Sequence, residues 1–219
     1  MTNVFEHVRA ADARRRSAAA GATETAIFEA TERLLEAMPL HDLSVAHIVT
    51  AADTSRATFY RYFTSKDAVV AGLLAKVMDE VFEPVSVLLE GDASARAMPI
   101  DAALRDAWAV LAGHVPVLRA VSENWHRIPE LQSLWLSIVD RFVDAIAGQI
   151  DRERAAGLAP AGTDSTALAT MLVWSAERMM YIASGPVPGA LHGVERAVGP
   201  VGELWRSAVY GDIAHRADV

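Results

Sequence analysis

Residues 43–76 read LSVAHIVTAADTSRATFYRYFTSKDAVVAGLLAK, and they are the most informative part of the sequence. It divides into two short helical segments joined by a polar turn, followed by the start of a longer helix. Ser44 can cap the first segment, which has an apolar stripe at Val45, Ile48 and Val49. Asp53 tolerates a left-handed backbone conformation, and Ser55 can satisfy the free amides of the next helix. The pattern therefore predicts two helices joined by a tight turn.

The second short segment carries hydroxyl, aromatic and arginine side chains at unusual density: Ser55, Arg56, Thr58, Tyr60, Arg61 and Tyr62. Phe59 and Phe63 are expected to point inward. The outward set suits a surface that presses against a phosphate backbone and reaches into a groove. Lys66 then falls in the first turn of the third helix, where its charge opposes the helix dipole. A nearby anion such as DNA phosphate would explain a lysine at this position.

The run SRATFYRYFTSKD at residues 55–67 resembles the helix-turn-helix of TetR-type transcriptional regulators, and the match extends from Thr23 to Val77. The resemblance implies base contacts from Arg56, Thr58 and Arg61. It implies phosphate contacts from a second group: Ser44, Ser55, Tyr60, Tyr62 and Lys66.

The chain departs from the family pattern in two places. Asp53 and Thr54 stand where family members usually have Gly and Val, a change that is sterically tolerable. The outer face of the first short helix is often basic in the family, and here it offers only Ala46, His47, Thr50 and Ala51. Sequence specificity is therefore expected to rest mainly on Arg56, Thr58 and Arg61. The departures also keep open an alternative, a helical ligand-binding or adaptor protein that has lost specific DNA binding.

An alanine-rich segment precedes this unit. We expect residues 1–22 to form a flexible basic arm in which Arg14, Arg15 and Arg16 follow a phosphate or enter a minor groove. A solvated tail without a function fits these residues equally well. Residues 23–68 are then expected to form the DNA-binding domain, and residues 69–219 a ligand-binding and dimerisation domain.

The rest of the chain has a helical pattern almost throughout, with hardly any period-two alternation, so we predict an all-α fold. Pro84 is expected to end or kink the helix that starts near Ser65. Later helices are expected at about residues 103–111, 118–127, 129–154, 164–183 and 194–210.

The last two of these helices are apolar on more than one face, as Leu168, Met171, Ile182, Val201 and Leu204 illustrate. A surface helix needs one apolar stripe, and a second stripe needs a second partner. The resemblance implies that these helices pair with their copies in a homodimer. Deep burial within a monomer is the alternative.

Large apolar side chains are frequent in the second domain, and in TetR-type proteins this domain commonly encloses an apolar ligand cavity. The C-terminal half is similar to the branch that controls ethionamide bioactivation, in DRERAAG at residues 151–157 and WxxxxYG at residues 205–211. That resemblance implies a ligand site at Trp108, Trp135, Phe142, Val173, Ala176, Tyr181 and Trp205. The branch tends to have asparagines at Val173 and Ala176, so a more apolar effector is expected here. Ordinary core packing is the alternative for each residue.

Composition limits the remaining possibilities. The 219 residues include no cysteine, which excludes disulfides and thiolate metal sites. No apolar run or signal-peptide pattern indicates a membrane protein, so a cytoplasmic location is expected. The net charge is −8, with 9 Lys/Arg against 11 Asp/Glu in residues 1–80 and 11 against 17 in the remainder. An acidic body disfavours indiscriminate DNA binding.

No motif of an enzyme is present: there is no G-x-S-x-G, no H-E-x-x-H and no phosphate-binding glycine loop. His126 near Glu123 is more typical of a surface polar contact than of catalysis or a metal site. We therefore expect no catalytic residue, metal or cofactor. The sequence predicts a TetR-like homodimeric repressor that a small apolar effector releases from a palindromic operator on double-stranded DNA.

Overall fold

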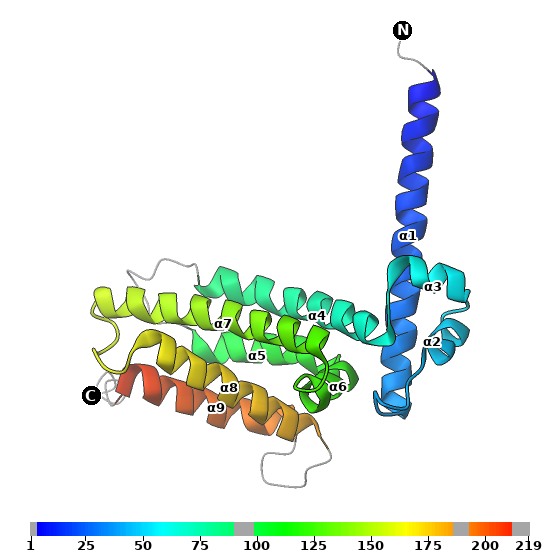
Figure 1. Ribbon diagram of the computed structural model, residues 1–219. Helices are drawn as coiled ribbons and strands as arrows, with labels where there is room; N and C mark the ends of the chain where they lie inside the picture. The colour runs from blue at the N-terminus through cyan, green and yellow to red at the C-terminus, as the bar shows by residue number, and fades with distance from the viewer. Residues whose placement is uncertain (1–3, 90–98, 186–192, 212–219) are drawn as a thin grey trace. The chain divides into compact units, whose positions relative to one another are not determined.

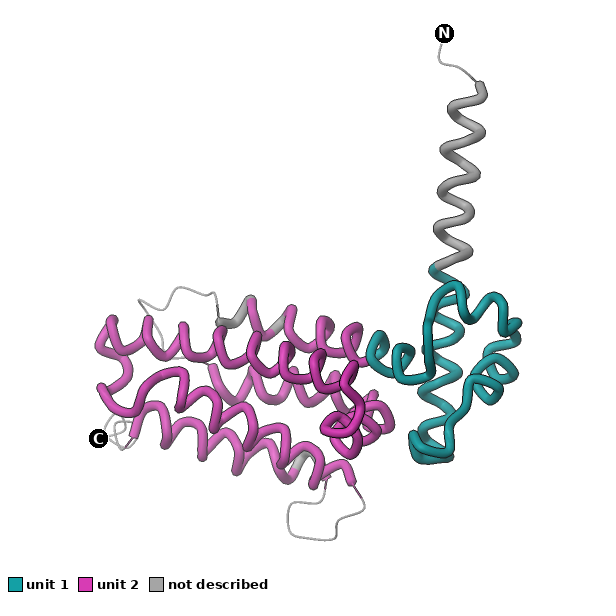
Figure 2. Tube along the Cα trace, in the orientation of Figure 1, with its two compact units in different colours: residues 1–73 teal, residues 74–219 magenta. Residues whose placement is uncertain are grey.

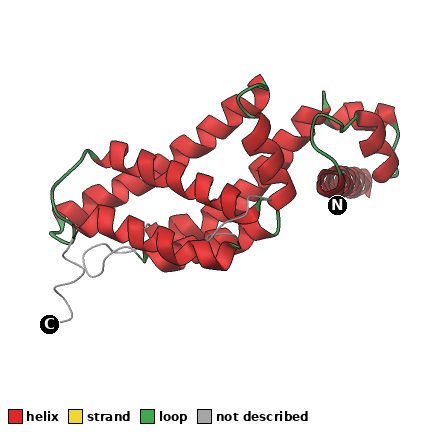
Figure 3. Cartoon of the chain, turned by 90° about the horizontal axis from the view of Figure 1, so that it is seen from below, coloured by secondary structure: helices red, strands yellow, loops and turns green. Residues whose placement is uncertain are grey.

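The computed structural model describes residues 4–89, 99–185 and 193–211; the side chains of residues 4–20, 84, 87–89 and 194–195 lie outside this description. Every regular element in the described ranges is an α-helix, which confirms the predicted all-α fold (Figure 3). The chain divides into two compact units, Met1–Leu73 and Leu74–Val219 (Figure 2). No helix in the described ranges is long and apolar enough to cross a membrane.

The first unit contains α1 (Val4–Ala37), α2 (Val45–Ala51), α3 (Arg56–Tyr62) and the first turns of α4 (Lys66–Leu89) (Figure 1). Apolar side chains from all four helices and from the α1–α2 loop are removed from water, which is the main stabilising contribution to this unit. The buried set includes Ile27, Leu35, Leu43, Ile48, Phe59, Val69 and Val70.

The two short helices have the caps that the sequence predicts. The Ser44 side chain accepts a hydrogen bond from the His47 amide at 3.2 Å, and the Ser55 side chain accepts one from the Thr58 amide at 3.0 Å. Each bond satisfies an amide that has no partner within the first turn of its helix. Between the helices, Asp53 has a φ of 47°, the left-handed conformation expected at this turn.

An aromatic cluster joins α3 to α1 and α4. Phe59 and Phe63 are buried as predicted, and the ring centroid of Phe63 lies 5.4 Å from that of Phe28 on α1. Gly72 lets α4 approach this cluster, because a Cβ at that position would lie 3.1 Å from Cζ of Phe28. The cluster holds α3 in place and leaves its other face to solvent.

The largest differences from the predicted helix boundaries are in α1 and α4. The α1 backbone is helical from Val4, whereas we expected residues 1–22 to form a flexible arm. The segment is rich in alanine, the residue with the highest helix propensity, and Gly21 alone does not interrupt the helix. The α4 helix also continues through Pro84 to Leu89, so Pro84 does not end it.

The second unit comprises the rest of α4 together with α5 (Ile100–Ala112), α6 (Val115–Asn124), α7 (Pro129–Ala155), α8 (Ser165–Ser184) and α9 (Val194–Tyr210). Helix α8 packs between α7 and α9, and α9 also packs against α5 (Figure 1). The bounds of α7, α8 and α9 agree closely with the sequence prediction.

A buried polar contact ties the ends of α7 and α9 together. The Glu153 carboxylate is fully buried and accepts hydrogen bonds from the Tyr210 hydroxyl at 2.7 Å and from Nε2 of Gln149 at 2.9 Å. Just beyond these residues, Gly157 and Gly211 have positive φ values of 74° and 60°. Glycine favours this conformation where a helix ends. The two C-terminal motifs of the sequence are therefore in contact in the fold.

Candidate nucleic-acid interface and apolar cavity

Helix α3 presents a polar and aromatic face to solvent. Ser55, Arg56 and Arg61 are exposed, and the Tyr60 side chain is 56% exposed. The Tyr60 ring packs edge-on against the buried Phe59, with ring centroids 5.4 Å apart, and the rest of the side chain remains accessible to solvent. The predicted base-contacting and phosphate-contacting residues of α3 therefore share one accessible element.

The hydroxyls around α3 are partly used within the fold. Ser55 Oγ and Thr58 Oγ1 lie 2.9 Å apart in a hydrogen bond, so neither side chain rotates freely. Ser44 accepts from the His47 amide, which leaves its own hydroxyl proton available to another acceptor. Tyr62 is half-buried, with the Arg61 guanidinium 5.9 Å from its ring centroid. Phosphate oxygens are acceptors that these groups can contact.

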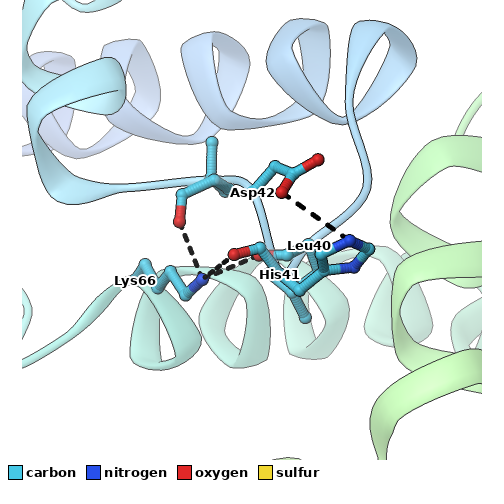
Figure 4. A network of polar contacts seen from close by, with 5 residues as sticks. Leu40, His41, Asp42 and Lys66 are labelled. Atoms are coloured by element: carbon cyan, nitrogen blue, oxygen red, sulfur yellow. Dashed lines mark hydrogen bonds and ion pairs between the residues drawn. The ribbon is translucent and has the colours of Figure 1, made fainter.

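Lys66 has acceptors inside the protein. Its ammonium donates to the carbonyl oxygens of Leu40 and Leu43, each at 2.7 Å, and to that of His41 at 3.4 Å (Figure 4). These carbonyls belong to the loop between α1 and α2. From the sequence we expected DNA phosphate to be the negative partner of Lys66. The carbonyl oxygens of the loop are such a partner within the protein, and they account for a cation at the start of α4.

Two other sequence expectations concern this surface. The outer face of α2 is as weakly basic as predicted, with His47, Thr50 and Ala51 exposed. Arg14, Arg15 and Arg16 lie on the helical backbone of α1, but their side chains are outside the described part of the chain.

A cavity of about 160 Å³ lies within the second unit. Its wall is almost entirely apolar and comes from α4, α5, α6, α7, α8, the residue after α8 and α9. All seven residues that the sequence analysis assigned to a ligand site are part of this wall: Trp108, Trp135, Phe142, Val173, Ala176, Tyr181 and Trp205.

One part of the wall is polar. Glu177 on α8 has a side chain that is 10% exposed, and its Oε1 accepts a hydrogen bond from the Ser122 hydroxyl of α6 at 2.8 Å. Its Oε2 lies 3.7 Å from Nε of Arg178. Nearby, the Tyr181 hydroxyl donates to Glu123 at 3.3 Å. Burial, together with the Glu123 carboxylate, raises the pKa of Tyr181, so its hydroxyl keeps its proton and remains a donor.

Three polar atoms of the wall have no hydrogen-bond partner among the described residues: Nε1 of Trp135, Nε1 of Trp205 and Oε2 of Glu177. All three are buried. A buried polar atom without a partner costs about 1–3 kcal/mol, so such atoms are uncommon in folded proteins.

Apart from Tyr181, sequence reasoning missed the polar residues of the cavity wall: Arg119, Ser122, Glu177 and Ser184. Nothing in the spacing of Glu177 along the sequence indicated a cavity. The contact of Glu177 with Ser122 joins residues 55 positions apart, which helical periodicity cannot reveal.

Helices α8 and α9 each expose a large apolar side chain. Met171 is 69% exposed and Leu204 is 52% exposed, although most apolar residues of these helices are buried. The sequence showed apolar residues on more than one face of these two helices. In the structure one face packs inside the second unit, and Met171 and Leu204 lie on the outer face, where solvent reaches them.

Comparison with known proteins agrees with this architecture. Residues 27–73 match the family model for bacterial regulatory proteins of the tetR family, and residues 93–211 match the C-terminal domain of the transcriptional regulator EthR. The HTH-type transcriptional regulator EthR of Mycobacterium tuberculosis is 30% identical over 198 residues, covering 86% of this chain and 88% of that protein. EthR of Mycolicibacterium smegmatis is 31% identical over 200 residues, covering 87% of each.

Solved structures show the same fold at lower identity. A TetR-family regulator from Syntrophomonas wolfei superposes with a TM-score of 0.70 at 16% identity, covering 84% of this chain and 93% of that one. A transcriptional regulator from Saccharomonospora viridis, solved in complex with choline, gives a TM-score of 0.64 at 20% identity, covering 85% of this chain and 96% of that one. With the N-terminal family match, the EthR-type C-terminal domain and the EthR relatives together, the chain belongs to the TetR family and is a DNA-binding transcriptional regulator.

Proposed function

We propose that this regulator is a homodimeric repressor that a small apolar effector, bound in the second unit, releases from a palindromic operator. The observation that carries the proposal is the apolar cavity of about 160 Å³, whose wall comes from α4, α5, α6, α7, α8 and α9. A protein that only bound DNA would gain stability by filling such a space. A pocket of this kind is the usual form of a small-molecule site.

In the DNA complex, Arg56, Thr58 and Arg61 of α3 would contact base edges in the major groove. Ser44, Ser55, Tyr60 and Tyr62 would contact phosphates on either side, and the arginines of α1 at residues 14–16 would add further phosphate contacts. Exposure of the α3 face supports this arrangement. We assign Lys66 a positioning role, because its ammonium already binds the α1–α2 loop.

The homodimer would form through α8 and α9. Support comes from Met171 and Leu204, two large apolar side chains that solvent reaches and that a partner copy would cover. A two-fold dimer presents two reading helices and therefore selects a two-fold-symmetric DNA site.

Helix α4 offers a route from the cavity to DNA binding. Met78, Val81 and Val85 of α4 line the cavity, while the first turns of the same helix belong to the first unit. Phe142, also in the cavity wall, packs edge-on against Phe82 of α4 with ring centroids 5.1 Å apart. An effector that displaces Phe142 would therefore act on α4. Such an effector lowers DNA affinity only by favouring a conformation that fits the operator less well.

Selection of bound duplexes from a random pool at physiological salt tests the proposal at its first step. We expect a two-fold-symmetric site to be enriched by the wild type. The Arg61→Ala variant should bind with relaxed specificity, whereas Tyr60→Phe, which keeps the ring and removes a phosphate donor, should keep the sequence preference with lower affinity. No enrichment by a folded, dimeric wild type would instead indicate a ligand-binding protein without specific DNA binding.

A further inference from the structure

Helix α4 is attached to the second unit differently from the other helices. Among the described residues, the backbones of α7 and α8, of α8 and α9, and of α5 and α9 pack closely, whereas that of α4 approaches none of them to the same extent. Side chains therefore make most of the attachment of this part of α4. A helix held in this way can move at lower cost than a helix that is packed closely along its length.

One group of side chains joins α4 to α7 beside the cavity. The Arg141 guanidinium of α7 lies over the ring of Phe82 of α4, with Cζ 3.6 Å from the ring centroid. Its Nη1 donates a hydrogen bond to Oδ1 of Asp79, also on α4, at 2.7 Å. Phe142 of α7 lines the cavity and packs against the same Phe82 ring, with centroids 5.1 Å apart. Two consecutive residues of α7 thus contact one ring of α4.

The contact of Arg141 combines two interactions that are each weak. The side chains of Arg141 and Asp79 are 47% and 70% exposed, so their ion pair alone contributes little to stability. The guanidinium over the half-buried Phe82 ring adds a cation–π attraction. Because the guanidinium is planar, it can stack on the ring and bind the carboxylate at the same time. The combination resists separation of α4 from α7, while the buried apolar core maintains the fold.

A ligand in the cavity would act on this contact through one side chain. Phe142 belongs to the cavity wall and Phe82 does not, so a ligand that displaces Phe142 outward moves the Phe82 ring that packs against it. Movement of that ring disrupts its stacking on Arg141. The ligand therefore has to overcome the attraction between Arg141 and α4 before α4 can move.

We propose that Arg141 is a positioning residue that holds α4 against α7 and thereby opposes the effector. This inference rests on the proposed function, because it concerns regulation through the same cavity. A contact that stabilises one of two conformations lowers the apparent affinity of any ligand that favours the other. Loss of the Arg141 contact should therefore make the protein more sensitive to its effector.

Arg141→Met tests the proposal, because it removes the charge and keeps a long side chain next to Phe82. The probe is 1-octanol, a small apolar molecule, with 1-hexanol and 1-decanol as shorter and longer homologues. Titration calorimetry on the full-length protein without DNA should show about 3- to 10-fold tighter binding to the variant than to the wild type, the range available from one exposed ion pair and one cation–π contact. The alcohol concentration that releases half of the bound operator should fall by the same factor.

Three further variants assign the effect to this contact. Arg105→Met removes a positive charge from an exposed position of α5 and should leave alcohol affinity within about 2-fold of the wild type. Arg141→Lys keeps a charge near Asp79 but loses the planar group, so its affinity should lie between those of the wild type and Arg141→Met. In Phe82→Leu, which removes the ring between Arg141 and Phe142, adding Arg141→Met should change the affinity by less than about 2-fold.

Unchanged or weaker alcohol binding by Arg141→Met would overturn the inference, as would tighter binding without release of the operator at a lower alcohol concentration. The same gain in Arg105→Met, or a full effect of Arg141→Met in Phe82→Leu, would also overturn it. A general loss of stability does not tighten ligand binding, so the expected gain is specific to a positioning role. Arg141→Lys decides the question if Arg141→Met does not fold. In all these cases the wild type still binds the alcohols, and the proposed effector site stands. If none of the three alcohols binds the wild type, the proposed effector site fails and the inference fails with it.

Discussion

Replacing Lys66 with methionine tests whether this residue positions the reading unit or contacts DNA. Two hydrogen bonds of 2.7 Å, to the carbonyls of Leu40 and Leu43, would be lost. A hydrogen bond to a charged group contributes about 1.5–3 kcal/mol, but both carbonyls are only partly buried, so water can replace part of the contribution. We therefore expect the free energy of unfolding of the first unit to fall by about 2 kcal/mol in total.

Urea unfolding without DNA, followed by circular dichroism, measures this loss. Lys76→Met is the matched control, because Lys76 is exposed on the same helix and its substitution should change stability by less than about 0.5 kcal/mol. DNA affinity measured over a range of salt concentrations gives the second readout. A positioning role predicts weaker binding with an unchanged salt dependence, because no phosphate contact is lost.

The opposite pair of results would refute this reasoning. If Lys66→Met unfolds at the same urea concentration as the wild type while the slope of log affinity against log salt falls by about 1, Lys66 contacts phosphate as the sequence first suggested. The hydrogen bonds from Lys66 to the two carbonyls would then make no measurable contribution to the free energy of unfolding.

Three further predictions follow from other parts of the structure. Replacing both Met171 and Leu204 with glutamate should give a folded monomer in analytical ultracentrifugation, since charges on the outer faces of α8 and α9 oppose pairing. Tyr210→Phe should lower the free energy of unfolding by about 1–3 kcal/mol in urea, because the buried Glu153 loses a donor; unchanged stability would argue against this contact. Asp53→Gly should raise the thermal midpoint slightly, since glycine adopts a φ of 47° without steric cost, and a lower midpoint would contradict this account.

The starts and caps of several helices could be predicted from the sequence. Pro129 marks the start of α7 because proline fits the first turn of a helix, and Asp164 caps α8 by accepting a hydrogen bond from the Ala167 amide at 2.9 Å. The caps at Ser44 and Ser55 follow the same logic. Signals of this kind depend on neighbours in the sequence, which is why the bounds of α7, α8 and α9 could be predicted closely, whereas α6 is Val115–Asn124 where residues 118–127 were expected.

Contacts between residues that are far apart in the sequence could not be predicted in this way. The sequence contains both motifs that hold Glu153 and Tyr210, but their hydrogen bond spans 57 positions. Lys66 and the carbonyl of Leu40 are 26 positions apart, so the sequence pattern could not reveal their contact. An external anion was therefore the partner that we expected for Lys66. The cavity wall was predicted through family resemblance and not through periodicity, because a tryptophan facing a cavity and one in a packed core leave the same pattern.

Operator affinity with and without a bound cavity ligand shows whether the cavity is coupled to DNA binding. Affinity for the selected operator should be measured with and without saturating 1-octanol, in the wild type and in Ala176→Trp, whose larger side chain fills the cavity. The account predicts a fall of about 5- to 150-fold in the wild type, the usual range of allosteric coupling, and no response in the variant. An affinity that stays constant while the ligand is shown by calorimetry to occupy the wild-type protein would contradict the claim.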